Sequence, residues 1–270
     1  MGIAKEVAAA LRKPFKAPDM SYTEDGTVNE NISVTVLDKE TCPRYLGHYI
    51  YDVKYTESPL WMKRRLIAVG HNAINAMVDI TNYVLVEMGQ PMHAFDLSTL
   101  EGSSIVVRRA NEGEELVTLD EKTRVLTTNN LLICDKVKAV GLAGVMGGLN
   151  SEITENTKEV LFESAKFLKD NVRKTSRSLG LRSDAAARFE KGIDEWTVEC
   201  GMARALNLAQ TLGVAKISSS HFDESQGASK DKRVIEVATA KVNHVLGIKV
   251  PEEEMVTILE ALQFDVKLND

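Results

Sequence analysis

The 270-residue sequence has few cysteines, no long apolar run and no excess of positive charge. Its three cysteines lie far apart and form no CxxC pair, which argues against a disulfide framework and a zinc ribbon. No apolar run reaches the roughly 18 residues of a membrane span, and the N-terminus has no apolar signal region. The net charge of −6 excludes a uniformly basic nucleic-acid-binding surface. We therefore expect a cytoplasmic protein with no membrane or DNA partner.

Common catalytic signatures are also missing. There is no HExxH, and the five histidines are too far apart for a sequence-local metal site. No GxSxG elbow occurs, and no paired carboxylates indicate glycoside chemistry. The glycine-rich segment 141–148 is not followed by the Gly-Lys-Ser/Thr of a P-loop and lacks the GxGxxG order of a dinucleotide site.

The sequence does contain alternating short strand and helix patterns, with 44% hydrophobic residues. Alternation of apolar and polar residues predicts strands, and apolar residues three or four apart predict helices bounded by proline or glycine. Predicted helices cover 3–13, 60–69, 72–88, 166–181, 195–212, a helix-like turn that ends at Gly247 and a segment that starts at Pro251. Predicted strands cover 32–36, 45–55, 105–108, 115–119, 124–126, 131–134, 139–142, 160–162 and 234–237. The fold class is therefore α/β (mixed α+β), with a central mixed-sheet domain flanked by helices.

Two polar segments, 14–32 and 218–232, are predicted to be linkers because their side chains are too polar to fill a core. The second one precedes a small C-terminal α+β region. There, Met255, Ile258, Leu259 and Leu262 are expected to form the buried face of a helix, and Phe264 and Val266 to begin a new strand.

Three segments carry candidate chemistry, each with a structural alternative. His93 follows the end of a predicted helix. It is either a site residue that donates or accepts a proton near pH 7 or a structural histidine at a helix-to-loop corner. The glycines of 141–148 are suited to the floor of a tight pocket or to a strand-end turn. Glu163 follows an apolar triplet, so it is either a polar anchor in a mostly apolar pocket or the point where a strand reaches the surface.

A fourth segment, 169–194, has seven basic and four acidic residues, a local charge of +3 in an acidic chain. This excess predicts a cradle for phosphate groups. The alternative is a solvated helix face with internal salt bridges.

The order and spacing of six short sequences are more specific than any one of them. They are NYVL (82–85), GQPMHAFD (89–96), GVMGG (144–148), ESA (163–165), LGLRSDA (179–185) and RFEKG (188–192). Together they resemble the β subunit of bacterial phenylalanyl-tRNA synthetase. The resemblance implies an end of a B1-like region and a linker at 1–38, a B3/B4-like tRNA-editing domain at 39–225, and a truncated B5-like domain at 226–270.

This resemblance implies a function and a set of site residues. The domain is expected to hydrolyse tyrosine wrongly attached to phenylalanine tRNA, with His93 as the catalytic histidine. The implied substrate-binding residues are Glu163, Gly147, Ser183, Ala185 and Asn82. Glu163 matches the carboxylate that binds the tyrosine phenol, and Gly147 matches the glycine that leaves room for the amino acid. Ser183 stands where some members have threonine.

The resemblance also implies partners and cofactors. The partners are tRNA(Phe), tyrosine in the pocket, and a synthetase α subunit in an α₂β₂ assembly. Editing is expected to need no metal or cofactor in this chain, whereas the complete synthetase uses ATP and magnesium for aminoacylation.

Two other interpretations remain open at this point. The matched residues can serve as packing in a non-catalytic scaffold or RNA-binding module whose pocket is degenerate. Alternatively, the C-terminal helices bind nucleic acid.

Overall fold

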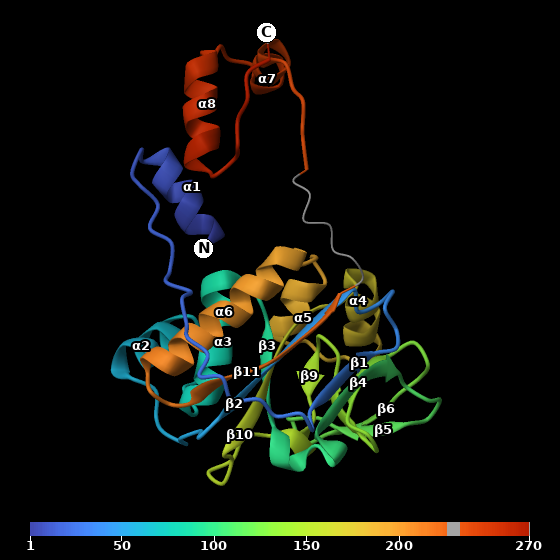
Figure 1. The fold of residues 1–270 in the computed structure, drawn as a ribbon. Helices are drawn as coiled ribbons and strands as arrows, with labels where there is room; N and C mark the ends of the chain where they lie inside the picture. The colour runs from blue at the N-terminus through green and yellow to red at the C-terminus, as the bar shows by residue number, and fades with distance from the viewer. Residues whose placement is uncertain (226–232, 270) are drawn as a thin grey trace. The chain divides into compact units, whose positions relative to one another are not determined.

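The computed structural model describes residues 1–225 and 233–269 (Figure 1). The chain divides into a larger compact unit, Asp19–Ala228, and a smaller one that joins Met1–Pro18 with Ser229–Asp270. The division predicted from the sequence falls instead after residues 38 and 225, and it assigns the two ends of the chain to different regions.

A four-stranded antiparallel sheet positions the site in the larger unit. Its strand order is β11 (Lys216–Ser225), β2 (Arg44–Tyr51), β10 (Glu159–Lys166) and β3 (Met92–Asp96). The two central strands, β2 and β10, are buried along almost their whole length. Helices α3 (Ala76–Met88) and α6 (Glu195–Thr211) pack against each other and against this sheet (Figure 1).

A second sheet has the order β1-β4-β7-β8-β9, with β1 parallel to β4 and the remaining pairs antiparallel. Its strands are Ser33–Val36, Ser104–Arg109, Leu131–Cys134, Ala139–Leu142 and Met146–Gly147. A hairpin of β5 (Glu115–Val117) and β6 (Thr123–Val125) adds a third small sheet.

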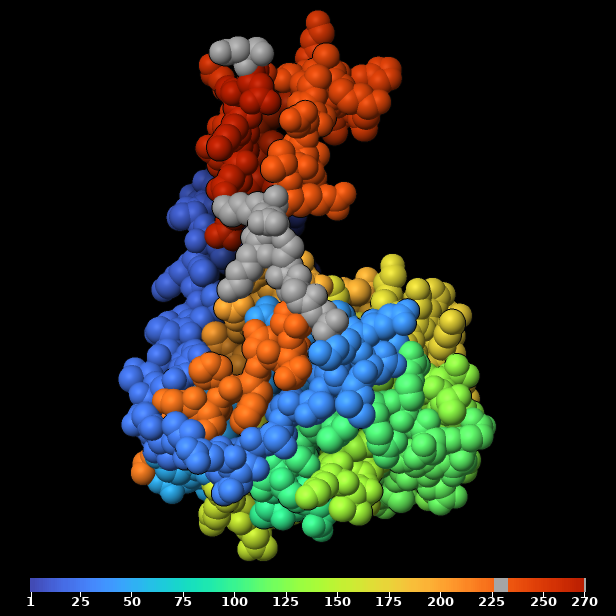
Figure 2. Space-filling model, turned by 45° about the vertical axis from the view of Figure 1, so that its right-hand side comes forward, coloured from blue at the N-terminus to red at the C-terminus, as the bar shows by residue number. Residues whose placement is uncertain are grey.

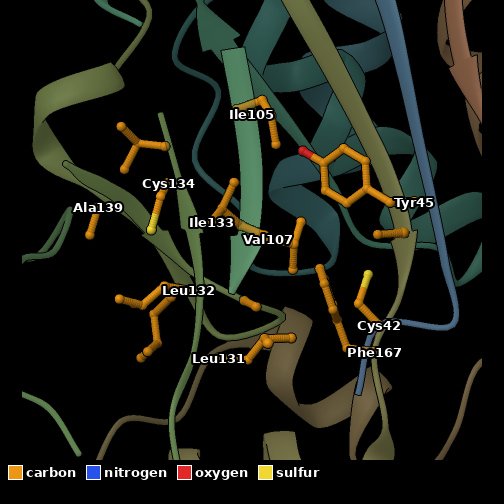
Figure 3. Close-up of a cluster of buried hydrophobic side chains, with 14 of the residues drawn as sticks. Cys42, Tyr45, Ile105, Val107, Leu131, Leu132, Ile133, Cys134, Ala139 and Phe167 are labelled. Atoms are coloured by element: carbon orange, nitrogen blue, oxygen red, sulfur yellow. The ribbon is translucent and has the colours of Figure 1, made fainter. Parts of the chain in front are cut away.

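The main hydrophobic core draws on both large sheets. Figure 3 shows Tyr45 of β2 near Ile105 and Val107 of β4 and Ile133 of β7. Phe167, which follows β10, is also part of this cluster. The core therefore holds the two sheets together, and Tyr45 carries a polar hydroxyl into it.

Local signals explain the ends of several helices. In α3, the Asn75 side chain accepts a 3.0 Å hydrogen bond from the Val78 N–H, and Gly89 ends the helix in the left-handed region at φ 82°. The other helices of the larger unit are α2 (Leu60–Ala68), α4 (Lys169–Ser178) and α5 (Asp184–Phe189), with 3₁₀ turns at Leu97–Thr99, Glu101–Ser103 and Leu149–Ser151. The smaller unit contains α1 (Gly2–Ala10), α7 (Thr239–Leu246) and α8 (Glu252–Ala261).

The predicted linker at 218–232 is wrong over its first part, because residues 218–225 belong to strand β11. Residues 226–232 lie outside the described part of the chain. The polar composition misleads because β11 buries small serines that find hydrogen bonds: the Ser218 hydroxyl donates to the Tyr49 carbonyl over 2.6 Å. The polar composition of residues 218–225 therefore belongs to an edge strand and not to a linker.

The first predicted linker, residues 14–32, contains no helix or strand, as predicted, but part of it is hydrogen-bonded to β11. The Asp25 N–H donates to the Ile217 carbonyl over 3.0 Å, and the Ser219 N–H donates to the Thr27 carbonyl over 2.8 Å. Figure 2 shows β11 in orange at the surface, next to blue N-terminal residues. These bonds satisfy backbone groups that an open sheet edge would expose.

Two elements near the site differ from prediction. Residues 92–96 form strand β3, although their place after a helix predicted a loop corner. The preceding helix starts at Ala76 instead of residue 72, which leaves Ile74 outside it and 58% exposed. Asn75 causes this later start, because its side chain caps the helix.

In the C-terminal region the predicted helices are confirmed, including α7, which Gly247 caps, whereas the predicted strands and the buried helix face are wrong. Helix α8 forms where predicted, but residues 234–237, Phe264 and Val266 lie in no strand. No residue of α8 is fully buried, and Ile258 on its predicted buried face is 43% exposed. The other three residues of that face, Met255, Leu259 and Leu262, are half-buried, and α8 contacts α1.

Candidate functional site

Strands β3 and β10 bring two predicted site residues together. His93 of β3 stands opposite Glu163 of β10 in the antiparallel register, and Gly47 of β2 flanks Glu163 on the other side. Residues directly opposite in neighbouring strands present their side chains on the same face of the sheet. Glu163 is only 8% exposed, so the strand does not surface there.

His93 and Glu163 line one cavity of about 70 Å³. Its walls come from β3, β7, β8, β9, β10, α5 and the turn between β8 and β9. Its lining residues are Pro91, Met92, His93, Phe95, Ile133, Gly141, Leu142, Ala143, Gly144, Val145, Met146, Gly147, Glu163, Ala185 and Phe189. Glu163 is the only acidic residue among them, in a wall that is otherwise mostly apolar.

The Glu163 carboxylate has one strong internal partner. The Tyr45 hydroxyl donates a 2.7 Å hydrogen bond to its Oε2. Burial raises the pKa of Glu163 to about 7, although the bond from Tyr45 acts to lower it. Burial also raises the pKa of Tyr45 well above its usual value, so the phenol keeps its proton and remains a donor.

His93 is a half-buried histidine whose Nε2 has no hydrogen-bond partner among the described residues. Its Nε2 is buried and makes no hydrogen bond within residues 1–225 and 233–269. Burial lowers the pKa of His93 to about 4, so the imidazole is neutral near pH 7. Its ring meets Phe95 edge-on at a centroid distance of 4.5 Å. Because His93 lines the cavity, its unpaired nitrogen is an available contact for a ligand.

Gly147 permits the close approach of β9 to His93. It pairs with Gly141 in the β8–β9 ladder. A Cβ atom at position 147 would lie 2.5 Å from His93 Cε1 and 3.0 Å from its Nε2. Only glycine fits there while the imidazole keeps its position.

The remaining predicted site residues have different positions. Ala185 of α5 lines the cavity. Ser183 does not line it, but its hydroxyl donates to the Val145 carbonyl over 2.6 Å and accepts a 3.0 Å bond from the Ala186 N–H. Ser183 therefore attaches the start of α5 to the cavity wall. Asn82 lies on α3 and is not among the lining residues.

The sequence reasoning missed Tyr45, which is the hydrogen-bond partner of Glu163. Its only sequence signal is its place in an aromatic, β-branched run. No local spacing connects two residues that are 118 positions apart.

The described residues contain neither a cluster suited to a metal ion nor a membrane-spanning helix. Within residues 1–225 and 233–269, no group of three or more His, Cys, Asp or Glu side chains is arranged to hold a metal ion. None of the helices in the same ranges has the length and apolar character needed to cross a bilayer.

The chain is similar to a described domain family and to several known proteins. A family model described as the B3/4 domain matches residues 41–213. The chain is 45% identical over 267 residues to the phenylalanine–tRNA ligase beta subunit of Syntrophus aciditrophicus, covering 98% of this chain and 33% of that protein. It is 40% identical over 270 residues to the beta subunit of Clostridium acetobutylicum, covering 99% and 34%. The chain thus spans about one third of these relatives.

A solved structure has a similar fold. It is an N-terminal fragment of the phenylalanyl-tRNA synthetase beta subunit from Pyrococcus horikoshii, with a TM-score of 0.50 and 11% identity. The match covers 92% of this chain and 69% of that one. This similarity concerns the fold alone.

Proposed function

This chain belongs to the B3/4 domain family, and from that premise we propose that its cavity hydrolyses the ester of tyrosine mistakenly attached to tRNA(Phe). The observation that carries the proposal is the buried Glu163 carboxylate in a mostly apolar wall, opposite His93. A tyrosine side chain offers the matching chemistry, an apolar ring with one hydroxyl.

Glu163 supplies the discrimination between tyrosine and phenylalanine. A purely apolar pocket distinguishes an added hydroxyl only about 10²-fold, whereas a site that hydrogen-bonds it reaches roughly 10⁴–10⁵-fold. Tyr45 occupies Oε2 of the carboxylate, which leaves Oε1 to accept the substrate phenol. Phenylalanine would desolvate Glu163 without giving it a bond, so the correct ester is spared.

His93 supplies a positioning contact for hydrolysis. Its neutral imidazole has a free buried nitrogen, which can accept a hydrogen bond from the attacking water or donate one to the substrate, depending on the tautomer. The water adds to the ester carbonyl, and the carbon–oxygen bond to the ribose breaks. The products are free tyrosine and an RNA with its terminal hydroxyl restored, so no redox partner is needed.

The size of the cavity supports a second candidate function. An engineered cavity of about 150 Å³ binds benzene, and the cavity here is about 70 Å³. Entry of a tyrosine ring therefore requires movement of the walls, and Met92 and Met146 are the flexible side chains that line them. If these walls stay closed, the domain is a scaffold or RNA-binding module with a degenerate pocket.

Release of tyrosine from Tyr-tRNA(Phe), compared with release of phenylalanine from Phe-tRNA(Phe), tests the proposal directly. We expect the chain to hydrolyse the tyrosyl ester preferentially, Glu163→Ala to abolish that preference, and Gly147→Trp to block hydrolysis by filling the cavity. Wild-type selectivity in Glu163→Ala would defeat the role of the carboxylate. Absence of hydrolysis together with no binding of free tyrosine would favour the scaffold.

The wider assembly follows from the same proposal. In a longer protein of this family, we propose that this region acts beside a synthetase α subunit in an α₂β₂ enzyme in the cytoplasm. ATP and magnesium would serve aminoacylation there, and the editing reaction in this chain would use neither.

A further inference from the structure

The basic segment identified in the sequence forms an exposed surface on α4, α5 and the loops that follow them. Its seven cationic residues are all exposed, and we call them the α4–α5 cationic surface. They are Lys169, Arg173, Lys174, Arg177, Arg182, Arg188 and Lys191. Helices α4 and α5 contact each other, so the seven residues belong to one region of the unit (Figure 1).

None of these seven side chains is paired with an acidic side chain of the described residues. The salt bridges in residues 1–225 and 233–269 involve other cations, such as Arg44, Arg108 and Arg204. Of the acidic residues in the same segment, Asp184 lies 3.5 Å from His71. The alternative interpretation was a solvated helix face with internal salt bridges. The face is solvated as that interpretation predicts, but these salt bridges are absent from the described residues.

The spacing of the positive charges on α4 destabilises the helix. Lys169, Arg173 and Arg177 follow one another at intervals of four residues, which places them on one face of the helix. Like charges at this spacing destabilise a helix by about 0.2–0.5 kcal/mol per pair. Val172 on the inner face of α4 is buried, so the three cations on the outer face remain exposed next to one another. A bound polyanion would relieve this repulsion.

Helix α5 contributes both to the cavity wall and to the cationic surface. Ala185 and Phe189 of α5 line the cavity, and exposed Arg182 and Arg188 are close to them in sequence. In an aminoacyl ester of RNA, the ribose that carries the ester also carries the last phosphodiester. When the ester lies in the cavity, the last phosphodiester of the RNA therefore lies only one ribose away from the cavity entrance.

We propose that the α4–α5 cationic surface binds phosphodiester groups near the 3′ end of the RNA whose ester enters the cavity. This inference rests on the proposed function for the identity of the RNA. The surface supplies most of the electrostatic attraction in a chain whose net charge is negative.

The test is binding of deacylated tRNA(Phe) transcript to the 270-residue chain over a range of salt concentrations. The double variant Arg173→Gln/Arg177→Gln removes two phosphate contacts, so the slope of log K against log salt should fall by about 1.5. This corresponds to a loss of affinity of tenfold or more near ~0.1 M salt. The matched control is Lys136→Gln/Lys158→Gln, which removes two exposed lysines outside this surface and should bind like the wild type.

A second arm locates the contact on the RNA. A transcript without its 3′-terminal CCA should lose affinity for the wild type, and the Arg173/Arg177 variant should lose much less from the same truncation. Additive losses would overturn the placement near the 3′ end. Equal binding by the variant, its control and the wild type would overturn the proposal and leave the surface to an acidic protein partner. Circular dichroism and the thermal midpoint show whether each variant is folded.

The outcome is separable from that of the proposed function. Binding of deacylated RNA does not depend on ester hydrolysis, so a chain that releases no tyrosine can still show the predicted salt dependence. Conversely, tyrosine release with unchanged RNA binding in the variant would sustain the editing function and defeat the cationic surface.

Discussion

The Tyr45 hydroxyl donates a 2.7 Å hydrogen bond to the Glu163 carboxylate, and both side chains are buried. Strand β2 carries the donor and its neighbour β10 carries the acceptor. The bond fixes one carboxylate oxygen and turns the other into the free acceptor on which the proposed recognition of a phenol depends. Tyr45 is therefore a positioning residue for Glu163.

Tyr45→Phe tests this role. Without the hydroxyl, the pKa of Glu163 should rise above about 7, because the hydrogen bond that lowers it is gone. Loss of the partner of a buried carboxylate should also cost about 1–3 kcal/mol of folding stability. We expect the preference for the tyrosyl over the phenylalanyl ester to fall, with recovery at higher pH as Glu163 ionises.

The matched control for Tyr45→Phe is Tyr49→Phe. Tyr49 also lies on β2 and donates to a glutamate, Glu159, but neither residue lines the cavity. Loss of the Tyr49 hydroxyl should lower folding stability, while the ester selectivity and the pH profile of that selectivity stay unchanged. Identical pH profiles for the two variants would count against the positioning role of Tyr45.

Much of the fold was predictable because local patterns agree with tertiary structure. The β7 and β8 runs and α6 with its glycine exit all form where their patterns predict them. In contrast, β11 is rich in serine, and its strand character comes from pairing with β2 and from buried side-chain hydrogen bonds. Composition cannot report such long-range pairing.

The candidate site was likewise predictable only in part from the sequence. His93, Gly147 and Glu163 were selected from the sequence, and the structure brings them to one cavity. The strand that carries His93 was missed, because its conformation is set by pairing with a distant strand, β10. Tyr45 was missed for the same reason. Residue types predict which chemistry is available, whereas the register between strands decides which groups meet.

The raised pKa of Glu163 predicts a pH-dependent folding stability. A carboxyl with pKa 4.5 in the unfolded chain and about 7 in the folded protein keeps its proton longer when folded, so stability should fall as pH rises from about 4.5 to 7. The full effect is about 3 kcal/mol. Denaturant unfolding at pH 5 and pH 8 should show this loss in the wild type, and Glu163→Gln should lack this contribution. Equal pH dependence in both proteins would contradict it.

The lowered pKa of His93 predicts a contribution of opposite sign. The folded protein resists protonation of this ring between about pH 6.5 and 4, so stability should fall as pH drops through that range. His93→Gln should remove this acid sensitivity. If His93 positions the attacking water, the same variant should lower kcat for tyrosyl-ester hydrolysis by about 100-fold, with a smaller change in KM. A variant with normal kcat would exclude that role.

Gly147 and Gly141 provide a matched pair of cavity glycines that face each other across the β8–β9 ladder. A Cβ at 147 meets His93 at 2.5 Å, whereas one at 141 meets Ile133 at an ordinary 3.7 Å. Gly147→Ala must displace the imidazole, and we expect it to cost about 1–3 kcal/mol of stability and most of the tyrosyl-ester hydrolysis. Gly141→Ala should retain stability and most activity, since its new methyl group finds normal contact distances. Measured side by side, similar losses in the two variants would mean that cavity volume, and not the position of His93, limits the reaction.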